Sequence, residues 1–433
     1  MARPRPHPDL RVLLNNRHVG LLSKTSGGAI SFRYAASWLE RERAIPVSLS
    51  LPLREDAYSG AAVTAFFENL LPDSETLRRR VAEKVGAEGT DSYSLLSRIG
   101  RDCVGALQFV PEGYDVAGDT TRIDGQPVSD REIEKILTNL SEAPLGMDQD
   151  QDFRISVAGA QEKTALLFHE GKWWKPHGTT PTTHLFKKQL GRLPNGLDLS
   201  SSVENEFYCL KLVAAFGLLA NEVKMQHFGK TKALVIERFD RMRMKDGRLL
   251  RIPQEDCCQA LSVAPTRKYQ TEGGPGMVEI LTLLKGSDRP AEDQKHFLKA
   301  QVLYWLLGAT DGHAKNFSVF LGPGGRFNLT PAYDVLTAQP CLQARQLHKK
   351  QMRLAMFVGD SRHYRMDYIQ GRHFIQTTVR AGLPAALAEE VLADVAGRAE
   401  AALSAVEKQM PAGFPEEIHD AVQRGFRERM RRL

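Results

Sequence analysis

Apolar and polar residues alternate with two different periods along the chain, and the period changes from strand-like to helix-like. In the first part, Leu10 to Leu22 predicts a hairpin with an Asn-Asn turn, and Ile45 to Leu53 alternates as a strand. Val63 to Val85 has the helical spacing, interrupted by a proline. These segments predict a small α/β unit over residues 1–110.

The rest of the chain divides into a connector, a strand-rich part and a helical part. Residues 111–151 read as a connector with one short helix, Asp130 to Leu140. Residues 152–253 are mostly strand-like, and from residue 254 onward the spacing becomes helical. The clearest helical stretches are Met277–Leu284, Asp293–Leu307 and Leu387–Met410. We therefore expect an α+β fold with a β-rich lobe over residues 152–253 and an all-α lobe over residues 254–433.

Composition sets bounds on size and on partners. The chain has 433 residues, 42% of them hydrophobic, which suffices for two or three units with their own cores. Its 58 basic and 52 acidic residues give a net charge of +6, too mild to indicate DNA binding by itself. A basic C-terminal tail is expected to be a solvated helix end, with arginines at Arg424, Arg427, Arg429, Arg431 and Arg432.

Cysteine usage and hydropathy favour a cytoplasmic protein. The five cysteines are odd in number and lack CxxC spacing, which argues against a disulfide framework and against a zinc site. The N-terminal sequence has no apolar signal region, and the apolar run Val302 to Leu307 is far too short to span a bilayer.

The most informative polar pattern is ATDGHAKNFSVF, residues 309–320, just beyond an apolar helix. Asp311 and Asn316 stand five residues apart, the spacing with which phosphoryl-transfer enzymes place a catalytic carboxylate and a metal-binding amide. Asp334, after a short strand-like run, is a candidate second metal ligand. Each residue alone has an ordinary explanation as a turn or a helix cap. The hypothesis therefore needs a nucleotide site elsewhere in the chain.

Residues 153–168, FRISVAGAQEKTALLF, supply a candidate phosphate loop. Two β-rich runs flank small and polar residues, as in a hairpin loop whose N–H groups face phosphates. A Walker-type loop is excluded, because its two glycine positions hold Val157 and Glu162. The FGKT sequence that ends at Thr231 fails the same test, since Lys224 stands at its first glycine position.

A lysine for the phosphates follows on the next predicted strand. TTHLFK, residues 182–187, ends in Lys187, with Lys188 as the alternative. A helix then begins at a predicted capping box, Ser201 to Glu204. Its acidic residues Glu204 and Glu206 are candidate partners of the lysine, although interaction with the helix dipole explains them equally well.

Lys232 to Arg241 predicts a buried strand that ends in charged residues. In a two-lobed kinase the segment between the lobes is such a strand, and its backbone groups bind the adenine edge. The sequence allows that role for Glu237, Arg238 and Phe239.

Taken together, the chain resembles HipA, the serine/threonine kinase toxins of bacterial HipBA toxin–antitoxin modules, nearly from end to end. The segments that carry the resemblance are SVAGAQEKTALL, TPTTHLFK, ERFDR, LRIPQEDCCQ, GGPG, LGATDGHAKNFSVF and LTPAYD. The resemblance implies a two-lobed protein-kinase-like fold, ATP and Mg²⁺ as cofactors, and transfer of phosphate to serine or threonine.

The resemblance also implies roles for individual residues. Asp311 is the catalytic base, Asn316 and Asp334 hold Mg²⁺, and Lys187 contacts the ATP phosphates. Ser156 matches the serine that HipA kinases autophosphorylate, and a phosphate there would add about −2 charge beside the ATP phosphates and so open the loop. The other implied nucleotide-site residues are Ala158, Gly159, Ala160, Gln161, Glu162 and Lys163 in the loop, Glu237, Arg238 and Phe239 at the adenine, and His313, Ala314, Lys315 and Tyr333.

The implied substrate is an aminoacyl-tRNA synthetase, typically the glutamyl enzyme, whose modification arrests growth and gives persistence. The implied partner is a HipB-like helix-turn-helix antitoxin, with operator DNA reached through that complex, and no membrane is involved. The chain lacks the GxGxxG, HRD and DFG motifs of eukaryotic kinases. Phosphoinositide kinases and aminoglycoside phosphotransferases use a similar spacing, so a lipid or small-molecule acceptor stays open. A non-catalytic co-repressor is the alternative of another class.

Overall fold

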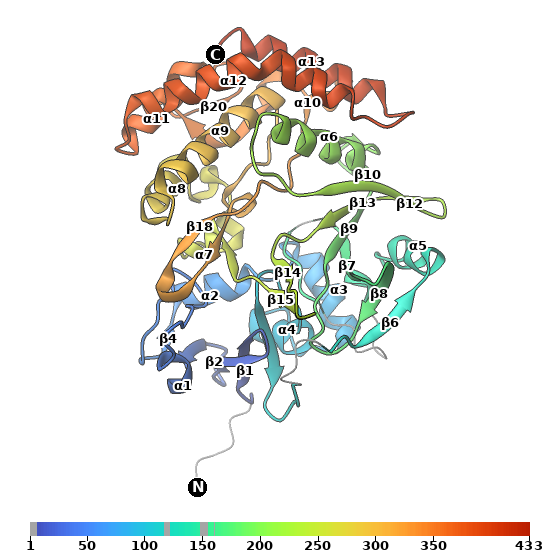
Figure 1. Ribbon diagram of the computed structural model, residues 1–433, viewed down its shortest axis with the longest axis vertical. Coiled ribbons are helices and arrows are strands. Elements are labelled where there is room, and N and C mark those ends of the chain that lie inside the picture. Colours follow the sequence, from blue (N-terminus) through green and yellow to red (C-terminus); the bar gives the residue numbers. More distant parts are fainter. Residues whose placement is uncertain (1–6, 117–121, 148–154, 160) are drawn as a thin grey trace. The chain divides into compact units, whose positions relative to one another are not determined.

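The computed structural model describes residues 7–116, 122–147, 155–159 and 161–433. The chain folds into two compact units, each assembled from separate stretches of sequence (Figure 1). Unit 1 contains Met1–Lys188, Gln226–Thr266 and Val319–Arg326. Unit 2 contains Gln189–Met225, Arg267–Ser318 and Phe327–Leu433.

Unit 1 begins with an antiparallel five-stranded sheet of order β4-β3-β2-β1-β5. The strands are β1 (Leu10–Leu14), β2 (Arg17–Lys24), β3 (Ile30–Tyr34), β4 (Tyr58–Ser59) and β5 (Leu107–Pro111). Asn15 and Asn16 connect β1 to β2 with φ angles of 49° and 63°, as a two-residue type I′ turn requires. The predicted hairpin is confirmed.

Helices pack on this sheet around an aromatic core. They are α1 (Ala36–Leu39), α2 (Ala61–Glu68), α3 (Glu75–Val85) and α4 (Ser92–Ile99). Phe67 is fully buried and meets Phe32 and Phe109 edge to face, with ring centroids 5.9 and 5.7 Å apart. The helical run predicted over Val63 to Val85 is indeed broken near Pro72, between α2 and α3.

The strand predicted over Ile45 to Leu53 is wrong. This stretch contains only an isolated bridge between Ser48 and Leu51 and a turn closed by a hydrogen bond from Leu51 N to Ser48 O, 3.1 Å. The physical reason is a carboxylate far away in sequence. Glu255 accepts hydrogen bonds from Ser48 Oγ at 2.5 Å and from Leu49 N at 2.7 Å, which draws the backbone away from strand pairing.

A second sheet, of order β12-β13-β9-β7-β8-β6, follows in unit 1. Its strands are β6 (Gly125–Val128), β7 (Lys163–His169), β8 (Lys172–Pro176), β9 (His184–Lys188), β12 (Val223–Phe228) and β13 (Thr231–Glu237). Helix α5 (Asp130–Thr138) covers one face, and its Ile133 and Leu137 share a core with Leu166, Phe186 and Phe228. The strands predicted around Lys187 and Val235 are confirmed, whereas residues 155–158, in the first β-rich run, form no strand.

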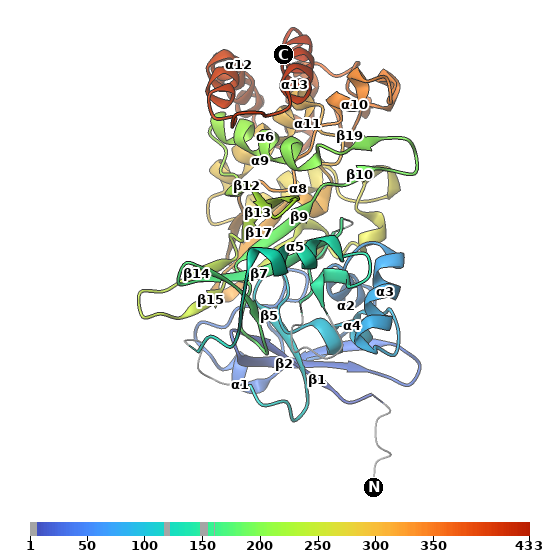
Figure 2. The ribbon, with the colours of Figure 1, turned by 90° about the vertical axis from the view of Figure 1, so that its right-hand side faces the viewer.

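A buried charge network joins the two sheets of unit 1. Asp102 accepts from Arg241 at 2.9 Å and from Arg251 at 2.8 Å, and Asp240 accepts from Arg238 at 2.9 Å. The arginines lower the pKa of Asp102 far below its usual range and that of Asp240 to about 2, against the effect of burial. Arg241 and Arg251 pair with each other at the base of the hairpin of β14 (Arg241–Arg243) and β15 (Leu249–Arg251). Figure 2 shows the backbone of this hairpin.

The remaining elements of unit 1 are short. Strand β16 (Gln254–Asp256) leads into helix α7 (Cys257–Ala260). This helix begins with a capping box formed by Asp256 and Gln259. Strand β17 (Ser318–Leu321) lies next to β16 in a small sheet.

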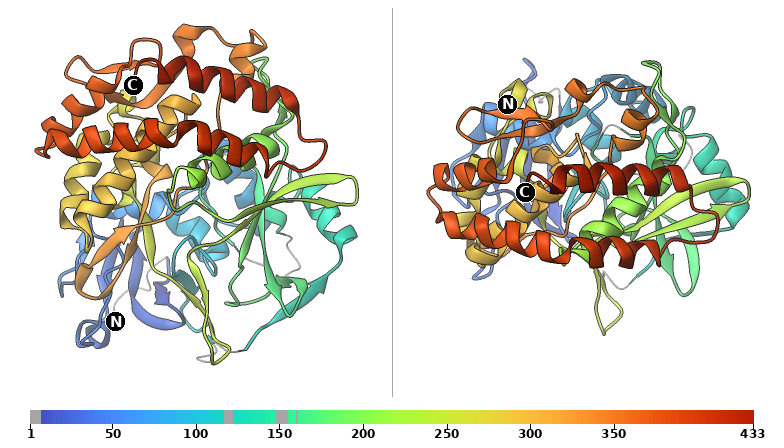
Figure 3. Two further views of the ribbon diagram at one scale, coloured as in Figure 1. Left: turned by 45° about the horizontal axis from the view of Figure 1, so that its top comes forward. Right: turned by 90° about the horizontal axis from the view of Figure 1, so that it is seen from above.

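Unit 2 is mostly helical. Its helices are α6 (Ser202–Ala215), α8 (Met277–Leu283), α9 (Pro290–Leu307), α10 (Gln339–Gln343), α11 (Gly371–Arg380), α12 (Ala385–Glu407) and α13 (Glu416–Met430). Its short strands are β10 (Gly191–Arg192), β11 (Asp198–Leu199), β18 (Phe327–Leu329), β19 (Arg353–Val358) and β20 (His363–Arg365). Helix α9 is buried along most of its length, and α12 and α13 lie side by side near the C-terminus (Figure 3).

Two predictions about helix ends in unit 2 need correction. Ser201 precedes α6, but its side chain makes no capping hydrogen bond, so the predicted capping box does not form. Gln189 replaces it: its Oε1 accepts from Val203 N at 2.8 Å, and its Nε2 donates to Glu204 at 2.6 Å. In the basic tail, Arg429 is buried and donates to Leu306 O at 2.8 Å, whereas the other four arginines are exposed as expected.

All five cysteines are buried as free thiols. Within the described ranges, each helix is too short or too polar to serve as a membrane-spanning segment.

Candidate functional site

The loop that carries Asp311 follows directly from the end of helix α9. Gly308 ends the helix in the left-handed conformation, with φ of 76°. Gly312 then passes so close to Tyr304 that a Cβ atom would lie 2.5 Å from the tyrosine ring. Asp311 O accepts from His313 N at 2.8 Å, and the loop closes in the 3₁₀ turn Ala314–Asn316. A glycine at the start of the loop and another in its middle thus allow a tight loop that turns back within a few residues.

Asp311 lies at the exposed edge of this loop, with 59% of its side chain accessible. Its Oδ1 accepts a hydrogen bond from the hydroxyl of Tyr269, and Nε2 of the buried His313 lies 3.9 Å from the same oxygen. The rings of Tyr269 and His313 meet edge to face, with centroids 4.9 Å apart. A carboxylate that is accessible and held by a donor has the arrangement of a base for an incoming hydroxyl.

The structure brings Asn316 and Asp334 together. Asn316 is buried, and its Nδ2 donates to Asp334 O at 3.2 Å. Asp334 has a φ of 57°, a left-handed conformation that is uncommon for a residue other than glycine and that clusters at functional sites. Tyr333 supports the arrangement, because its hydroxyl donates to Lys315 O at 2.7 Å and lies 2.6 Å from Ser318 Oγ.

These residues suit a Mg²⁺ ion that is shared with phosphate groups. Among the described residues no cluster of three or more His, Cys, Asp and Glu side chains forms a complete metal cage. Mg²⁺ is instead held by one or two carboxylates together with substrate phosphates, and an amide oxygen is an equally hard ligand. The buried hydroxyl of Tyr304 has no hydrogen-bond partner among the described residues, and the charge of Asp334 adds to the burial that raises its pKa. A polar group left unsatisfied near Asp334 fits a site that is completed by a ligand.

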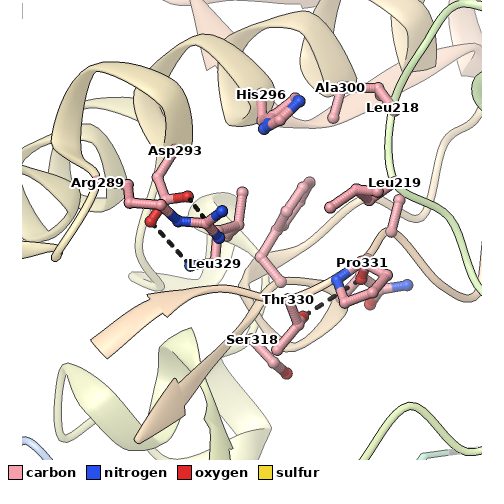
Figure 4. Close-up of a pocket in the computed structure, with 13 residues that line it drawn as sticks. Leu218, Leu219, Arg289, Asp293, His296, Ala300, Ser318, Leu329, Thr330 and Pro331 are labelled. Carbon is pink, nitrogen blue, oxygen red and sulfur yellow. Dashed lines mark hydrogen bonds and ion pairs between the residues drawn. The ribbon is translucent and has the colours of Figure 1, made fainter. Parts of the chain in front are cut away.

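A small pocket within unit 2 is lined by Asn316 and by the residues that lead to Asp334 (Figure 4). Leu219 and Pro331 form apolar walls. Asp293 and His296 line the pocket from α9, and Arg289 lines it from the position just before this helix. Asp293 is buried and accepts from Leu329 N at 2.9 Å, so it anchors the strand that leads to Asp334. The pocket lining also includes Asn316, Phe317, Ser318, Leu218, Ala300, Leu329, Thr330 and Ala332.

The candidate phosphate loop in unit 1 is attached to the N-terminal helices. Ser156 is fully buried. Its Oγ donates a hydrogen bond to Leu70 O at 2.7 Å, and its backbone N–H donates to Asp102 O at 3.0 Å. Gly159 pairs with Pro72, and its carbonyl accepts from Asp73 N at 3.2 Å. Lys163 donates from Nζ to Ala158 O at 2.8 Å. Ala160 lies outside the described residues.

The register of the second sheet separates Lys187 from Lys188. Lys187 on β9 stands opposite Lys163 on β7, so both side chains lie on the same face of the sheet, and both are buried. Lys188 instead lies 3.6 Å from Glu162, which Arg80 also contacts at 2.9 Å. Gln161 donates to Lys188 O at 3.1 Å. Of the two alternatives, Lys187 is therefore the lysine that lies on the same face of the sheet as Lys163.

The three residues of the segment predicted to bind adenine differ in burial and in contacts. Glu237 is exposed at the end of β13, and Phe239 packs edge to face on Phe320 with centroids 5.6 Å apart. Arg238 is buried in the charge network described above, and its backbone N–H donates to Thr183 O at 2.9 Å. The guanidinium of Arg238 therefore stabilises the fold of unit 1.

The predicted site residues fall in both units: the loop, Lys187 and residues 237–239 in unit 1, and Asp311, His313, Asn316, Tyr333 and Asp334 in unit 2. Sequence reasoning missed Tyr269 and Tyr304, which contact the loop that carries Asp311. The sequence feature that could have indicated Tyr269 is its position shortly before the glycine-rich turn at Gly273 and Gly274. Tyr304 has no signal, since it lies within an ordinary apolar helix pattern.

Comparison with known proteins gives a consistent result. Residues 10–110 match the HipA N-terminal domain, and residues 155–403 match the HipA-like C-terminal domain. “Putative kinase Y4mE” of Sinorhizobium fredii is 37% identical over 331 residues, which cover 76% of this chain and 77% of that protein. “Serine/threonine-protein kinase toxin HipA” of Shewanella oneidensis is 28% identical over 341 residues, 76% of this chain and 75% of that one.

A solved structure confirms the predicted fold. A chain from the Shewanella oneidensis MR-1 toxin–antitoxin complex of HipA, HipB and operator DNA superposes with a TM-score of 0.80 at 25% identity. The superposition covers 98% of this chain and 96% of that one.

Proposed function

The chain belongs to the HipA family of kinases, and on that premise we propose that it is an ATP- and Mg²⁺-dependent serine/threonine protein kinase that acts as the toxin of a HipBA-type module. The observation that carries the proposal is the loop in which Asp311 is accessible, held through Oδ1, and followed by an Asn316 that contacts the Asp334 backbone. This is the residue set that phosphoryl transfer requires.

In the proposed mechanism, the acceptor hydroxyl donates its hydrogen bond to Asp311 and attacks the γ-phosphate in line. Asp311 takes the proton as the new phosphorus–oxygen bond forms and the bond to the leaving ADP oxygen breaks. Lys187 neutralises negative charge that develops on the phosphates. Asn316 and Asp334 would hold Mg²⁺, which supplies further positive charge on the phosphate oxygens when bound.

We also propose that Ser156 is an autophosphorylation site. Its hydroxyl is fully buried and bonded to Leu70 O, so the loop must leave the N-terminal helices before the serine can act as an acceptor. Once phosphorylated, Ser156 cannot return to this dry position without burying about two negative charges. The modification would therefore keep the loop away from its ATP-binding conformation.

The proposed partners are a HipB-like antitoxin and, through it, operator DNA, as in the complex of the Shewanella oneidensis relative. Charge distribution in unit 2 supports the DNA part of this proposal. Residues 345–380 contain eight Lys and Arg and only two Asp, a net charge of +6 that equals the net charge of the whole chain. Seven of these basic residues are exposed, which is the electrostatic footprint of a phosphate-backbone contact. The proposed protein substrate is an aminoacyl-tRNA synthetase, typically the glutamyl enzyme.

The proposal is tested by incubating the wild-type protein and Asp311→Asn with Mg²⁺ and ATP, followed by intact-mass measurement and phosphopeptide mapping. We expect one phosphate on Ser156 of the wild type and none on Asp311→Asn, because an amide cannot accept the proton. Asp420→Asn, a change at an exposed aspartate of the same unit, is the matched control and should incorporate phosphate like the wild type. Equal incorporation in Asp311→Asn would refute the assignment of the base.

A second candidate, a non-catalytic co-repressor, is favoured by the same basic segment of unit 2. Growth assays separate the two functions. If Asp311→Asn arrests growth as strongly as the wild type, phosphoryl transfer is not the toxic activity.

A further inference from the structure

Tyr269 lies outside the proposed machinery but contacts it directly. Its hydroxyl donates to Oδ1 of Asp311, and its ring packs edge to face on His313, which follows Asp311 by two residues. Tyr269 comes from a different part of unit 2, the stretch between the turns Pro265–Arg267 and Gln270–Glu272.

The loop after Tyr269 is built to hold this tyrosine in place. Its carbonyl oxygen accepts from Glu272 N and from Gly274 N, each at 3.0 Å. A Cβ atom on Gly274 would overlap the carbonyl oxygen of Arg267 and lie 2.8 Å from that of Tyr269. Gly273 has a φ of 86°, which other residues rarely adopt. The GGPG segment, to which the proposed mechanism gives no role, is therefore the tight turn that fixes the backbone of Tyr269.

The side chain of the neighbouring residue, Gln270, also anchors this loop. Gln270, the next residue, accepts from Phe357 N at 2.9 Å and so attaches the loop to strand β19. With its backbone held by the glycine turn and its neighbour held by β19, Tyr269 has little freedom to follow Asp311. The hydroxyl is therefore a fixed point toward which the carboxylate turns, rather than the reverse.

A fixed donor matters because Asp311 is more than half exposed. An exposed carboxylate rotates among several rotamers, and only one of them presents an oxygen to the acceptor hydroxyl. A carboxylate has two oxygens and room for about four hydrogen bonds, so a bond to Oδ1 leaves Oδ2 able to accept from the acceptor. A donor to the charged form also favours that form and keeps the base ready to take a proton.

We propose that Tyr269 is the positioning residue for the catalytic base: it holds Oδ1 of Asp311 so that Oδ2 faces the acceptor hydroxyl. The proposal rests on the proposed function of Asp311 and adds a second element of the chain, the glycine-rich loop, to the site. Tyr269 takes no proton and forms no bond in the reaction; it acts through Asp311.

The first test is steady-state kinetics of Tyr269→Phe with dephosphorylated casein as the acceptor. This variant removes one oxygen and retains the ring that packs on His313. We expect kcat to fall about tenfold to hundredfold, the range for loss of a hydrogen bond to a charged group, with the KM for ATP nearly unchanged. We expect the acid limb of the kcat/KM profile to move to higher pH, since the charged carboxylate loses a stabilising donor.

Tyr368→Phe is the matched control, because Tyr368 is an exposed tyrosine of the same unit with 56% of its surface accessible. It should leave kcat and the pH profile unchanged. An unchanged or increased kcat in Tyr269→Phe would overturn the proposal, since an increase would mean that Tyr269 competes with the acceptor for the base.

A second test reads the contact without any catalysis and so separates this proposal from the proposed function. In protein labelled with ¹³C at tyrosine Cζ, the resonance absent from Tyr269→Phe identifies Tyr269. Asp311→Asn should shift that resonance and lower the pH at which Tyr269 ionises, because the negative charge beside it is lost. If the resonance does not respond to Asp311→Asn, the contact does not exist and the proposal fails. If it responds while the wild type transfers no phosphate, the contact stands and the kinase assignment fails, and with it the positioning role.

Discussion

Glu255 makes the stability of unit 1 depend on pH, and the structure gives both the sign and the size of the effect. The side chain is fully buried on β16, with Oε2 held by Ser48 Oγ at 2.5 Å and Oε1 by Leu49 N at 2.7 Å. Burial raises the pKa of Glu255 to about 8, with a smaller contribution from the adjacent Asp256, and the two hydrogen bonds only partly oppose this.

The sign follows from proton linkage. A carboxyl group whose pKa is higher in the folded state than in the unfolded chain binds more protons when folded. Its favourable contribution is complete below about pH 4.5 and is lost as the pH rises to about 8, where Glu255 becomes charged in both states. A difference of about 3.5 units corresponds to an upper bound of about 5 kcal/mol, at 1.36 kcal/mol per unit.

The perturbation that isolates this effect is Glu255→Gln. Glutamine has the shape of the protonated carboxyl group, its oxygen can accept from Leu49 N, and the Ser48 hydroxyl can rotate to accept from its amide. We expect the free energy of unfolding of the variant to lie within about 1 kcal/mol of the wild type at pH 5. At pH 8 the variant should be more stable by several kcal/mol.

The assay is urea unfolding at intervals between pH 5 and pH 8, with the difference between the two proteins plotted against pH. Subtraction removes the contribution of every other titrating group. Glu42→Gln, at an exposed glutamate of unit 1, is the matched control and should stay within about 0.5 kcal/mol of the wild type. A constant difference for Glu255→Gln, or a variant less stable than the wild type at pH 8, would refute the reasoning.

Two further expectations concern the site. Measured by calorimetry, Lys187→Met should weaken ATP binding about tenfold to hundredfold. Lys188→Met should change the affinity for ATP by no more than about twofold, because Lys188 is already paired with Glu162. Equal losses of affinity in the two variants would contradict the assignment of Lys187. Gly312→Ala should lower the free energy of unfolding by about 1–3 kcal/mol and reduce phosphoryl transfer, since its Cβ would meet the Tyr304 ring. Gly397→Ala, with open space at the same atom in helix α12, should be neutral or stabilising by about 0.5–1 kcal/mol, and a loss of stability there would contradict this account.

Elements whose cause is local could be predicted from the sequence. The Asn-Asn hairpin needs only two residues that tolerate positive φ, and the break near Pro72 needs only the proline. The helix predicted from Asp130 is confirmed for the same reason, since Ser129 and Glu132 form its capping box within one turn. In each case the residues that determine the structure are neighbours in the sequence.

Predictions failed where a distant residue supplies the decisive hydrogen bond. The strand expected at Ile45 to Leu53 has a suitable pattern, but Glu255, more than 200 residues away, binds its backbone and a serine hydroxyl. The capping box expected at Ser201 is replaced by Gln189. Arg429 looked like part of a solvated tail and is instead buried against Leu306 O. Local propensity is a weak prior when tertiary contacts compete with it.

The same distinction explains which part of the candidate site could be found from the sequence. Asp311 and Asn316 lie in one loop, and its short length forces them to the same region, so their spacing alone carries chemical meaning. Tyr269 acts on Asp311 from 42 residues away, through a turn whose glycines have no chemical role of their own. A motif thus identifies the group that reacts, while the groups that orient it come from elements that meet only after folding. Tests of function in this chain should therefore pair each motif residue with the distant side chain that holds it.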